Sequence, residues 1–558
     1  MRVLTLSRFT VSALVVALSS TVAISPSWAD ENHQVEPSNA PITALSSLSS
    51  LRNVVNSTTL KTPDIQSFQT KTGTPTLFVA APELPIIDIR LTFDAGSARD
   101  GELRPGLYGL ASLTSQLLDE GTSTQTTSDI AKSFEQLGAA FSAASYRDMF
   151  TVNLRVLSDP AYFNPAIDQL LAILKDAQFP QDSINRVLNN AAIGQQQRKE
   201  SPAAVVGIRF FRELYGNHPY AEPVTGTENS LKKITPQDIR HFKDTYLVAN
   251  NLNIAITGQL NQQQAEQLAN RISQSLPAGN KAKPLPAPTE LSSAKTVAVP
   301  FNATQSHVMI GQIGINRENP DHYALAVGNE MLGGSGFNAL LMKELREKRG
   351  LTYGAYSGFT PMRAKGPFII SYSTRGDQAV ESIQVAKQTL NNFINQPLDQ
   401  QLLSETKEGM LNGYPLSLSS NESILGYLGM IGFYHLPINY LADYPKQIAA
   451  VTTQDIQQAM RKYIHPKQML TVVVGQPFDR NALNTPIASA TPASQPNASV
   501  TPSETQPKAE APQPLTQLQK PASIEPNTDQ SVTPIAENLM PLPTTQALPA
   551  STNFKPQP

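Results

Sequence analysis

The feature that most constrains the fold is a stretch that occurs twice, once near the end of each half of the chain. Residues Ile234–Gln259, ITPQDIRHFKDTYLVANNLNIAITGQ, align without gaps on Val451–Gln476, VTTQDIQQAMRKYIHPKQMLTVVVGQ. Threonine, Gln-Asp-Ile, tyrosine and Gly-Gln coincide at equal spacing in the two copies. Each copy has the pattern of a helix, a turn and a strand, so we predict two homologous halves that arose by duplication.

The order of predicted elements is also the same in both halves. In the first half, residues Ile87–Phe93 alternate with a period of two and predict a strand. A helix is predicted over Leu107–Glu120, and a long helical stretch over Ala161–Leu214. The second half repeats the order of strands and helices. We therefore predict an α+β fold of two α/β halves, each with strands and covering helices.

The N-terminal residues have the composition of an export signal. Arg2 and Arg8 flank the start of the apolar run Val11–Ile24, and Ser27–Ala29 forms a small-x-small site before Asp30, which is typical of a cleaved secretory signal. An uncleaved membrane anchor is the alternative, although the run is short for a bilayer span. We predict export to the periplasm, or alternatively secretion, with no membrane span after cleavage.

Shifts in composition set the remaining boundaries. Residues 479–558 contain 15 of the 44 prolines, and so polar a segment cannot bury enough apolar surface to fold. Four prolines without periodicity mark a linker at 277–294. The predicted organisation is a signal peptide, 1–29; an irregular leader, 30–61; a first domain, 62–276; the linker, 277–294; a second domain, 295–477; and a disordered tail, 478–558.

The composition of the whole chain excludes several functions. A formal net charge of -2 offers no basic surface for nucleic acid. The absence of cysteine excludes disulfides, thiolate metal sites and a cysteine nucleophile. Zinc-peptidase helices require two histidines three or four residues apart, and this sequence has no such pair. The histidines are His33, His218, His241, His307, His322, His435 and His465.

One helical segment has the frame of a zinc site without its ligands. Residues Gly109–Thr122, GLASLTSQLLDEGT, follow the segment DAGSARD, Asp94–Asp100. This frame resembles the active-site segment of the M16 (pitrilysin/insulinase) metallopeptidases, where H-x-x-E-H places two histidines and a general-base glutamate on one helical face. The resemblance places Ser112 at the first histidine, Ser115 at the glutamate and Gln116 at the second histidine. Hydroxyl and amide groups are poor zinc ligands, so we predict vacated positions with no catalytic residue and no metal.

The distal zinc ligand is missing as well. M16 peptidases take a further glutamate from a downstream helix, and the corresponding stretch, NNAAIGQQQ (Asn189–Gln197), has no acidic residue. We therefore predict that this chain binds no cofactor by itself. No histidine near Ser112 or Ser115 in the sequence could activate either as a nucleophile. A further matching segment, Glu213–Thr235, places His218 at the family's ordinary HPY position, which predicts a structural role.

The resemblance continues in the second half, at Leu332–Phe359, LGGSGFNALLMKELREKRGLTYGAYSGF. In M16 proteins this segment completes the active site from the opposite wall with an arginine and a tyrosine that contact substrate, and Arg346 and Tyr353 match their spacing. Guanidinium and phenol donors can bind a peptide carbonyl and stabilise its developing oxyanion. The alternatives are a solvated cation at a helix end and an aromatic residue at the edge of the core. The less certain candidates for this wall are Arg349, Tyr356, Gly333 and Gly334.

The matched segments span about Ile65–Gln476 and imply the M16 fold, two homologous LuxS/MPP-like halves, each a mainly antiparallel sheet covered by helices. In heterodimeric M16 enzymes, one subunit carries H-x-x-E-H and the other carries the Arg/Tyr wall. The resemblance therefore implies a non-catalytic subunit that pairs with an H-x-x-E-H-bearing M16 peptidase subunit, which holds the zinc, and helps to bind extended peptide substrates. The alternative is a non-enzymatic M16-derived scaffold or peptide-binding protein of the cell envelope.

Overall fold

A computed structural model describes residues 62–336 and 338–484 of the chain. The predicted signal peptide, the leader up to residue 61 and nearly all of the predicted tail lie outside the described residues. Within them, residues 277–294 contain neither helix nor strand, and the predicted domain boundaries remain predictions. No helix among the described residues is long and apolar enough to cross a membrane.

The first half contains a six-stranded sheet in the order β1-β2-β6-β3-β5-β4. Strands β2 and β6 are parallel, and the other neighbours are antiparallel. The predicted strand at residues 87–93 is confirmed as part of β3. The strands are β1 (Gln66–Gln69), β2 (Pro75–Ala80), β3 (Ile86–Phe93), β4 (Ala140–Ser145), β5 (Phe150–Leu157) and β6 (Leu252–Gly258).

The second half contains a five-stranded sheet in the order β7-β11-β8-β10-β9. Apart from the edge strand β1, this order reproduces that of the first sheet, again with one parallel pair, β7 and β11. The predicted α+β fold of two mainly antiparallel sheets covered by helices is confirmed. The strands are β7 (Lys295–Pro300), β8 (Gln305–Ile313), β9 (Ala355–Phe359), β10 (Pro367–Arg375) and β11 (Leu470–Gly475).

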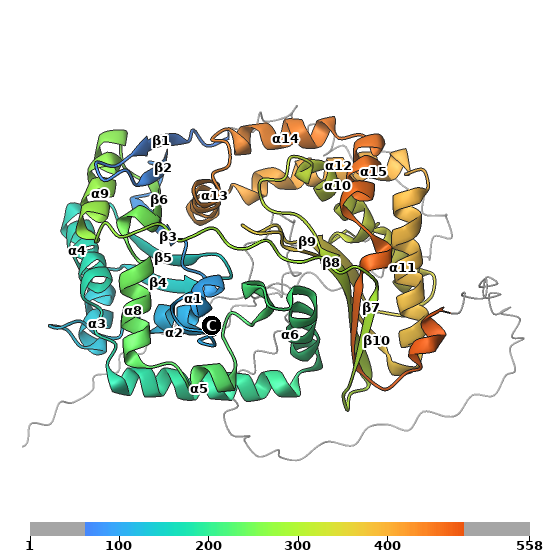
Figure 1. The fold of residues 1–558 in the computed structure, drawn as a ribbon. Helices are drawn as coiled ribbons and strands as arrows, with labels where there is room; N and C mark the ends of the chain where they lie inside the picture. Colours follow the sequence, from blue (N-terminus) through green and yellow to red (C-terminus); the bar gives the residue numbers. More distant parts are fainter. Residues whose placement is uncertain (1–61, 337, 485–558) are drawn as a thin grey trace, which may run out of the picture. The chain divides into compact units, whose positions relative to one another are not determined.

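Helices of both halves surround the two sheets (Figure 1). In the first half they are α1 (Asp100–Leu103), α2 (Leu110–Leu117), α3 (Thr127–Gln136), α4 (Pro160–Asp176), α5 (Gln181–Glu200), α6 (Pro202–Tyr215), α7 (Glu228–Leu231), α8 (Pro236–Tyr246) and α9 (Gln262–Ser275). In the second half they are α10 (His322–Gly333), the π-helix η5 (Met342–Glu347), α11 (Ala379–Asn395), α12 (Gln400–Ser417), α13 (Asn421–Phe433), α14 (Tyr440–Ala450) and α15 (Thr453–Tyr463).

The repeated stretch has the same local structure in both halves. Helices α8 and α15 each begin with a capping box, formed by Thr235 with Asp238 and by Thr452 with Asp455. In each copy the helix leads through a short turn into a strand, β6 or β11. Gly258 ends β6 with φ of +135°, and a Cβ there would lie 2.2 Å from the Ile86 oxygen. The shared Gly-Gln therefore marks a point where only glycine fits.

One helix of each half packs against the sheet of the other half. Helix α13 contacts β2, β3 and β6 of the first sheet, and helix α6 contacts β8 and β11 of the second (Figure 1). Phe210 of α6 is buried with Met309 and Val472 of the second sheet, whereas Leu428 of α13 is buried with Leu77 of the first. The two halves therefore share their hydrophobic cores.

Candidate functional site

The DAGSARD segment holds the start of helix α2, which carries the predicted vacated positions. Gly109 precedes the helix with φ of +94°. The Asp100 carboxyl group accepts hydrogen bonds from Gly109 N at 2.6 Å and Ala111 N at 2.8 Å. Burial raises the pKa of Asp100 to about 8, although these backbone donors oppose the shift. The side chain thus satisfies N–H groups that a helix start leaves free.

The three predicted vacated positions lie together on α2 and bond to one another. Ser112 and Ser115 are buried, and Ser115 Oγ donates to Ser112 O at 2.8 Å. Gln116 Nε2 lies 3.2 Å from both the backbone oxygen and Oγ of Ser112. The helix, which is shorter than the predicted 107–120, therefore satisfies these polar groups internally.

Helix α5 contacts α2 and contains the stretch where the distal glutamate was expected. Gln195 of this stretch is buried, and its Nε2 donates to Gly226 O at 2.9 Å. Gly226 has φ of +67°, and a Cβ there would lie 2.2 Å from Tyr108 O. The amide of Gln195 thus hydrogen-bonds the loop at Gly226, which packs closely against the backbone of Tyr108, just before α2. Among the described residues, no group of three or more His, Asp or Glu side chains is arranged to hold a metal ion.

His218 has the structural role that its sequence position predicted. Its Nδ1 accepts a hydrogen bond from Tyr220 N at 3.1 Å, and its Nε2 lies 3.0 Å from Pro286 O. Because Nδ1 accepts, Nε2 carries the proton that bonds the carbonyl. Burial lowers the pKa of His218, which keeps the ring neutral.

We expect the purified chain to bind only substoichiometric zinc and to keep its melting temperature when EDTA is added. A zinc ion bound to the folded state would stabilise that state by mass action, and a chelator would then lower Tm. Elemental analysis and thermal scans with and without EDTA check this prediction, with an H-x-x-E-H-bearing M16 protein as the control. One tightly held zinc per chain would contradict it.

The predicted substrate-contacting arginine lies on a π-helix. Helical periodicity in the sequence did not predict the wider turn of η5, a geometry that often occurs at functional sites. Arg346 is exposed, and its guanidinium lies 4.0 Å from the Met342 sulfur. Arg349 instead pairs with the Glu344 carboxylate at 2.7 Å and donates to Glu344 O at 2.9 Å. Arg349 is therefore tied to Glu344 of η5, and the Arg346 side chain is exposed.

The predicted tyrosine lies close in the chain to an open sheet edge. Tyr353 is 84% exposed, in the bend before β9, and Tyr356 lies on β9 and is 36% exposed. Strand β9 is an edge strand, and η5 contacts it. Arg346 thus lies on a helix that contacts β9, and Tyr353 lies in the bend that leads into β9. At 84% exposure the ring of Tyr353 does not pack at the edge of the core.

Gly333 and Gly334 end helix α10 behind β9. A Cβ on Gly333 would lie 2.5 Å from Ser357 Oγ of β9, and a Cβ on Gly334 would lie 2.2 Å from the Glu330 carboxylate. Both glycines therefore allow close approach of neighbouring groups. Their place in the structure supports β9 and involves no exposed contact surface.

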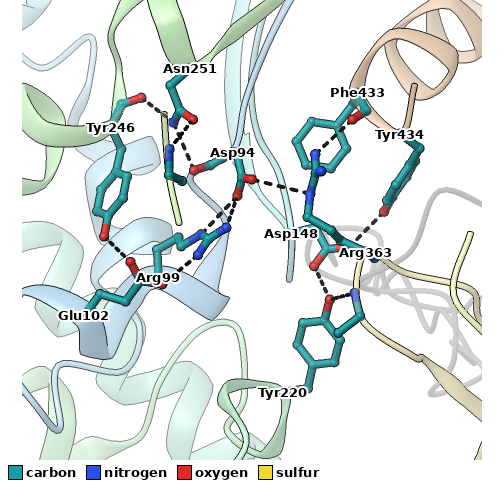
Figure 2. Close-up of polar contacts among 12 residues, drawn as sticks. Asp94, Arg99, Glu102, Asp148, Tyr220, Tyr246, Asn251, Arg363, Phe433 and Tyr434 are labelled. Atoms are coloured by element: carbon teal, nitrogen blue, oxygen red, sulfur yellow. Dashed lines mark hydrogen bonds and ion pairs between the residues drawn. The ribbon is translucent and has the colours of Figure 1, made fainter. Parts of the chain in front are cut away.

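A buried polar network between the halves was missed by the sequence analysis. Asp94 of the DAGSARD segment lies between Arg99 of the same segment and Arg363 of the second half (Figure 2). The sequence shows these residues only as separate charges, and Arg363 lies in a loop without periodicity. The only indication in the sequence was the resemblance of the segment around Asp94 to M16 peptidases. That resemblance concerned α2 and did not indicate a contact with the second half.

Two homologous α/β repeats, with a peptidase-type helix that lacks metal-binding groups, define a metallopeptidase-like protein with an altered site. Residues 77–228 match the family described as Insulinase (Peptidase family M16), and residues 233–410 match the Peptidase M16 inactive domain. The chain belongs to the M16 peptidase family.

Individual relatives agree with this assignment. A solved peptidase M16 inactive domain from Pseudomonas fluorescens is 35% identical with a TM-score of 0.71, and the match covers 74% of this chain and 98% of that one. The non-peptidase homolog YmxG of Helicobacter pylori is 24% identical over 72% of this chain and 91% of its own length. The uncharacterized zinc protease YmxG of Bacillus subtilis is 24% identical over 64% and 86%.

Proposed function

We propose that this chain is a catalytically inactive M16 subunit that pairs with a zinc-bearing M16 peptidase subunit and supplies Arg346 and Tyr353 for peptide binding. The observation that carries the proposal is a contrast within one chain. Helix α2 has no metal-binding groups, whereas Arg346 and Tyr353 are exposed on elements that adjoin at β9. The name of the Helicobacter pylori relative, a non-peptidase homolog, supports the absence of activity in this chain alone.

The exposed wall has the chemistry to bind an extended peptide. The Arg346 guanidinium is a fixed cation with several donors, and the Tyr353 hydroxyl is a donor on a rigid ring. Both can hold a peptide carbonyl and stabilise negative charge on its oxygen. Strands β9 and β4 lie at the edges of their sheets, where an extended peptide could add as a further strand. The zinc of the other subunit would activate the attacking water.

The compartment is part of the proposal. The predicted signal at residues 1–29 would export the chain, and we propose that the pair acts in the periplasm, or alternatively outside the cell. The sequence leaves the identity of the zinc-bearing subunit open. Genes adjacent to this one that encode an H-x-x-E-H protein would be the first candidates.

The direct experiment compares the chain alone with the reconstituted pair. The chain alone is expected to leave a casein-derived peptide mixture uncut, and the pair is expected to cut it faster than the zinc-bearing subunit alone. Mass spectrometry of the mixture and size-exclusion chromatography provide the readouts. Hydrolysis by the chain alone would contradict the proposal. Stable pairing without any gain in hydrolysis would favour the scaffold alternative.

Arg346→Ala is expected to lower kcat/KM of the assembled pair by on the order of 10²-fold, because one fixed donor to the reacting carbonyl is removed. Assembly should survive, since Arg346 is an exposed side chain. Lys348→Ala is the matched control, because Lys348 ends the same segment and its ammonium pairs with Glu344. Equal turnover of the Arg346 variant and the unsubstituted pair would remove Arg346 from the site.

A further inference from the structure

The loop between β9 and β10 connects the predicted substrate wall to the first half. Arg363 N donates to Asp148 Oδ2 at 2.7 Å, and Ala364 N donates to the Tyr220 hydroxyl at 3.1 Å. The Tyr215 hydroxyl donates to Lys365 O at 3.1 Å. Three consecutive residues of this loop therefore bond to the first half of the chain, so the loop is anchored as a unit.

The Arg363 side chain makes a second set of contacts. Its Nε lies 3.4 Å from Asp94 Oδ2, and its Nη2 donates to Phe433 O at 2.9 Å. Its guanidinium also lies 4.2 Å from the centre of the Phe433 ring. Arg99 bonds the other oxygen of Asp94 at 2.7 Å (Figure 2). Arg363 thus joins the DAGSARD segment to the end of α13.

Asp148 is the acceptor at the centre of the network. It accepts hydrogen bonds from the Tyr220 and Tyr434 hydroxyls and from Arg363 N (Figure 2). Burial and the neighbouring Asp148 raise the pKa of Tyr220 and of Tyr434 well above its usual value, so both phenols remain donors at neutral pH. Asp148 therefore ties two tyrosines of different halves to the backbone of the loop, which favours one arrangement of the loop.

Hydrogen bonds at the base of the loop connect the segment around Arg363 to β9. Thr360 N donates to Pro367 O at 2.9 Å across the base of the loop. Gly366 allows this closure, because a Cβ there would lie 1.7 Å from Thr360 O. Strand β9 begins two residues after Tyr353 and pairs with β10 along its length. Helix η5, which carries Arg346, contacts the same strand.

The DAGSARD segment contacts both α2 and the loop that contains Arg363. Its last residue, Asp100, caps α2, and its first residue, Asp94, pairs with Arg363. We propose that Arg363 is a positioning residue that fixes the Arg346/Tyr353 wall relative to the first half of the chain. This inference rests on the proposed function for its effect on turnover, but its effect on local structure stands independently.

The test uses the full chain with Arg363→Met, which keeps the aliphatic stem and removes the cation. Hydrogen exchange in peptides covering residues 353–366 is expected to accelerate by at least tenfold, with no comparable change in β2 or β6. Arg363→Lys keeps the cation and is expected to recover part of the protection. Arg375→Met is the matched control, because Arg375 lies at the far end of β10 in an exposed pair with Asp377.

In the reconstituted pair, Arg363→Met is expected to lower kcat/KM by about tenfold or more, because small misplacements of binding groups are costly, and Arg363→Lys should restore part of it. If no variant or unsubstituted pair shows turnover, the proposed function fails while the exchange result still decides the positioning role. Unchanged exchange at 353–366, or equal acceleration throughout the chain, would overturn the inference. If Arg363→Met does not fold, Tyr434→Phe removes one bond to Asp148, and the same peptides decide.

Discussion

Replacing Arg99 with Met is expected to lower the free energy of unfolding by about 3 kcal/mol, because it removes the buried cation that pairs with the half-buried Asp94 carboxylate and leaves only Arg363 beside it. Arg99 is 1% exposed and bonds Asp94 at 2.7 Å and Glu102 at 2.6 Å. The pair of Arg104 and Asp238 provides the control, because the Arg104 side chain is 48% exposed: Arg104→Met should cost less than about 1 kcal/mol. Chemical denaturation measures both variants.

The pH dependence of the Arg99→Met variant gives an independent check. Burial raises the pKa of Asp94, while Arg99 and Arg363 oppose that shift. Without Arg99 the pKa of Asp94 should rise further. A carboxyl group whose pKa is raised in the folded state destabilises that state when it ionises. The loss of stability therefore grows as pH rises towards and through the folded-state pKa. The loss of unfolding free energy in the variant should therefore be smaller at pH 5 than at pH 8. A deficit that is constant with pH would remove Asp94 as the cause.

Phe210→Ala should also cost about 3–5 kcal/mol, because it opens a cavity in a closed core. Phe210 is fully buried on α6 in the cluster with Met309 and Val472 of the second sheet. Although the substitution lies in the first half, hydrogen exchange should accelerate mainly in β8 and β11. Ile193→Ala is the control, because Ile193 is 60% exposed on α5 and its loss should stay within about 0.5 kcal/mol.

The outcome that would contradict this prediction is equally specific. A loss of stability below about 1 kcal/mol for Phe210→Ala would show that the site collapses without a cavity. Acceleration confined to strands of the first sheet would show that α6 does not stabilise the second sheet.

Local patterns in the sequence predicted the elements, because their causes are local. The capping boxes at Thr235 and Thr452 and the alternation in β3 are readable within a few residues. The apolar spacing of Val206, Phe210 and Leu214 likewise predicts a buried helical face. That spacing does not specify which sheet the face covers, so the exchange of α6 and α13 could not be predicted.

The site was predictable to the same local extent. The replacement of ligand types at Ser112, Ser115 and Gln116 can be seen from the chemistry of the side chains alone, once the frame is known. The hydrogen bonds among them are short-range and follow from helical spacing. The ion pair of Asp94 with Arg363 joins residues far apart in the chain, and a charge in a loop does not identify its distant acceptor.

The exchanged helices have a consequence for how the protein is made. Helix α6 leaves the ribosome long before β11, the last strand of the sheet that it covers. Its apolar stripe therefore remains only partly covered until β11 has been made, and long-range closure of this kind is slow and prone to aggregation. A chain that stops before Leu470 would leave that stripe only partly covered. The second core can therefore close only after both halves of the chain have been made.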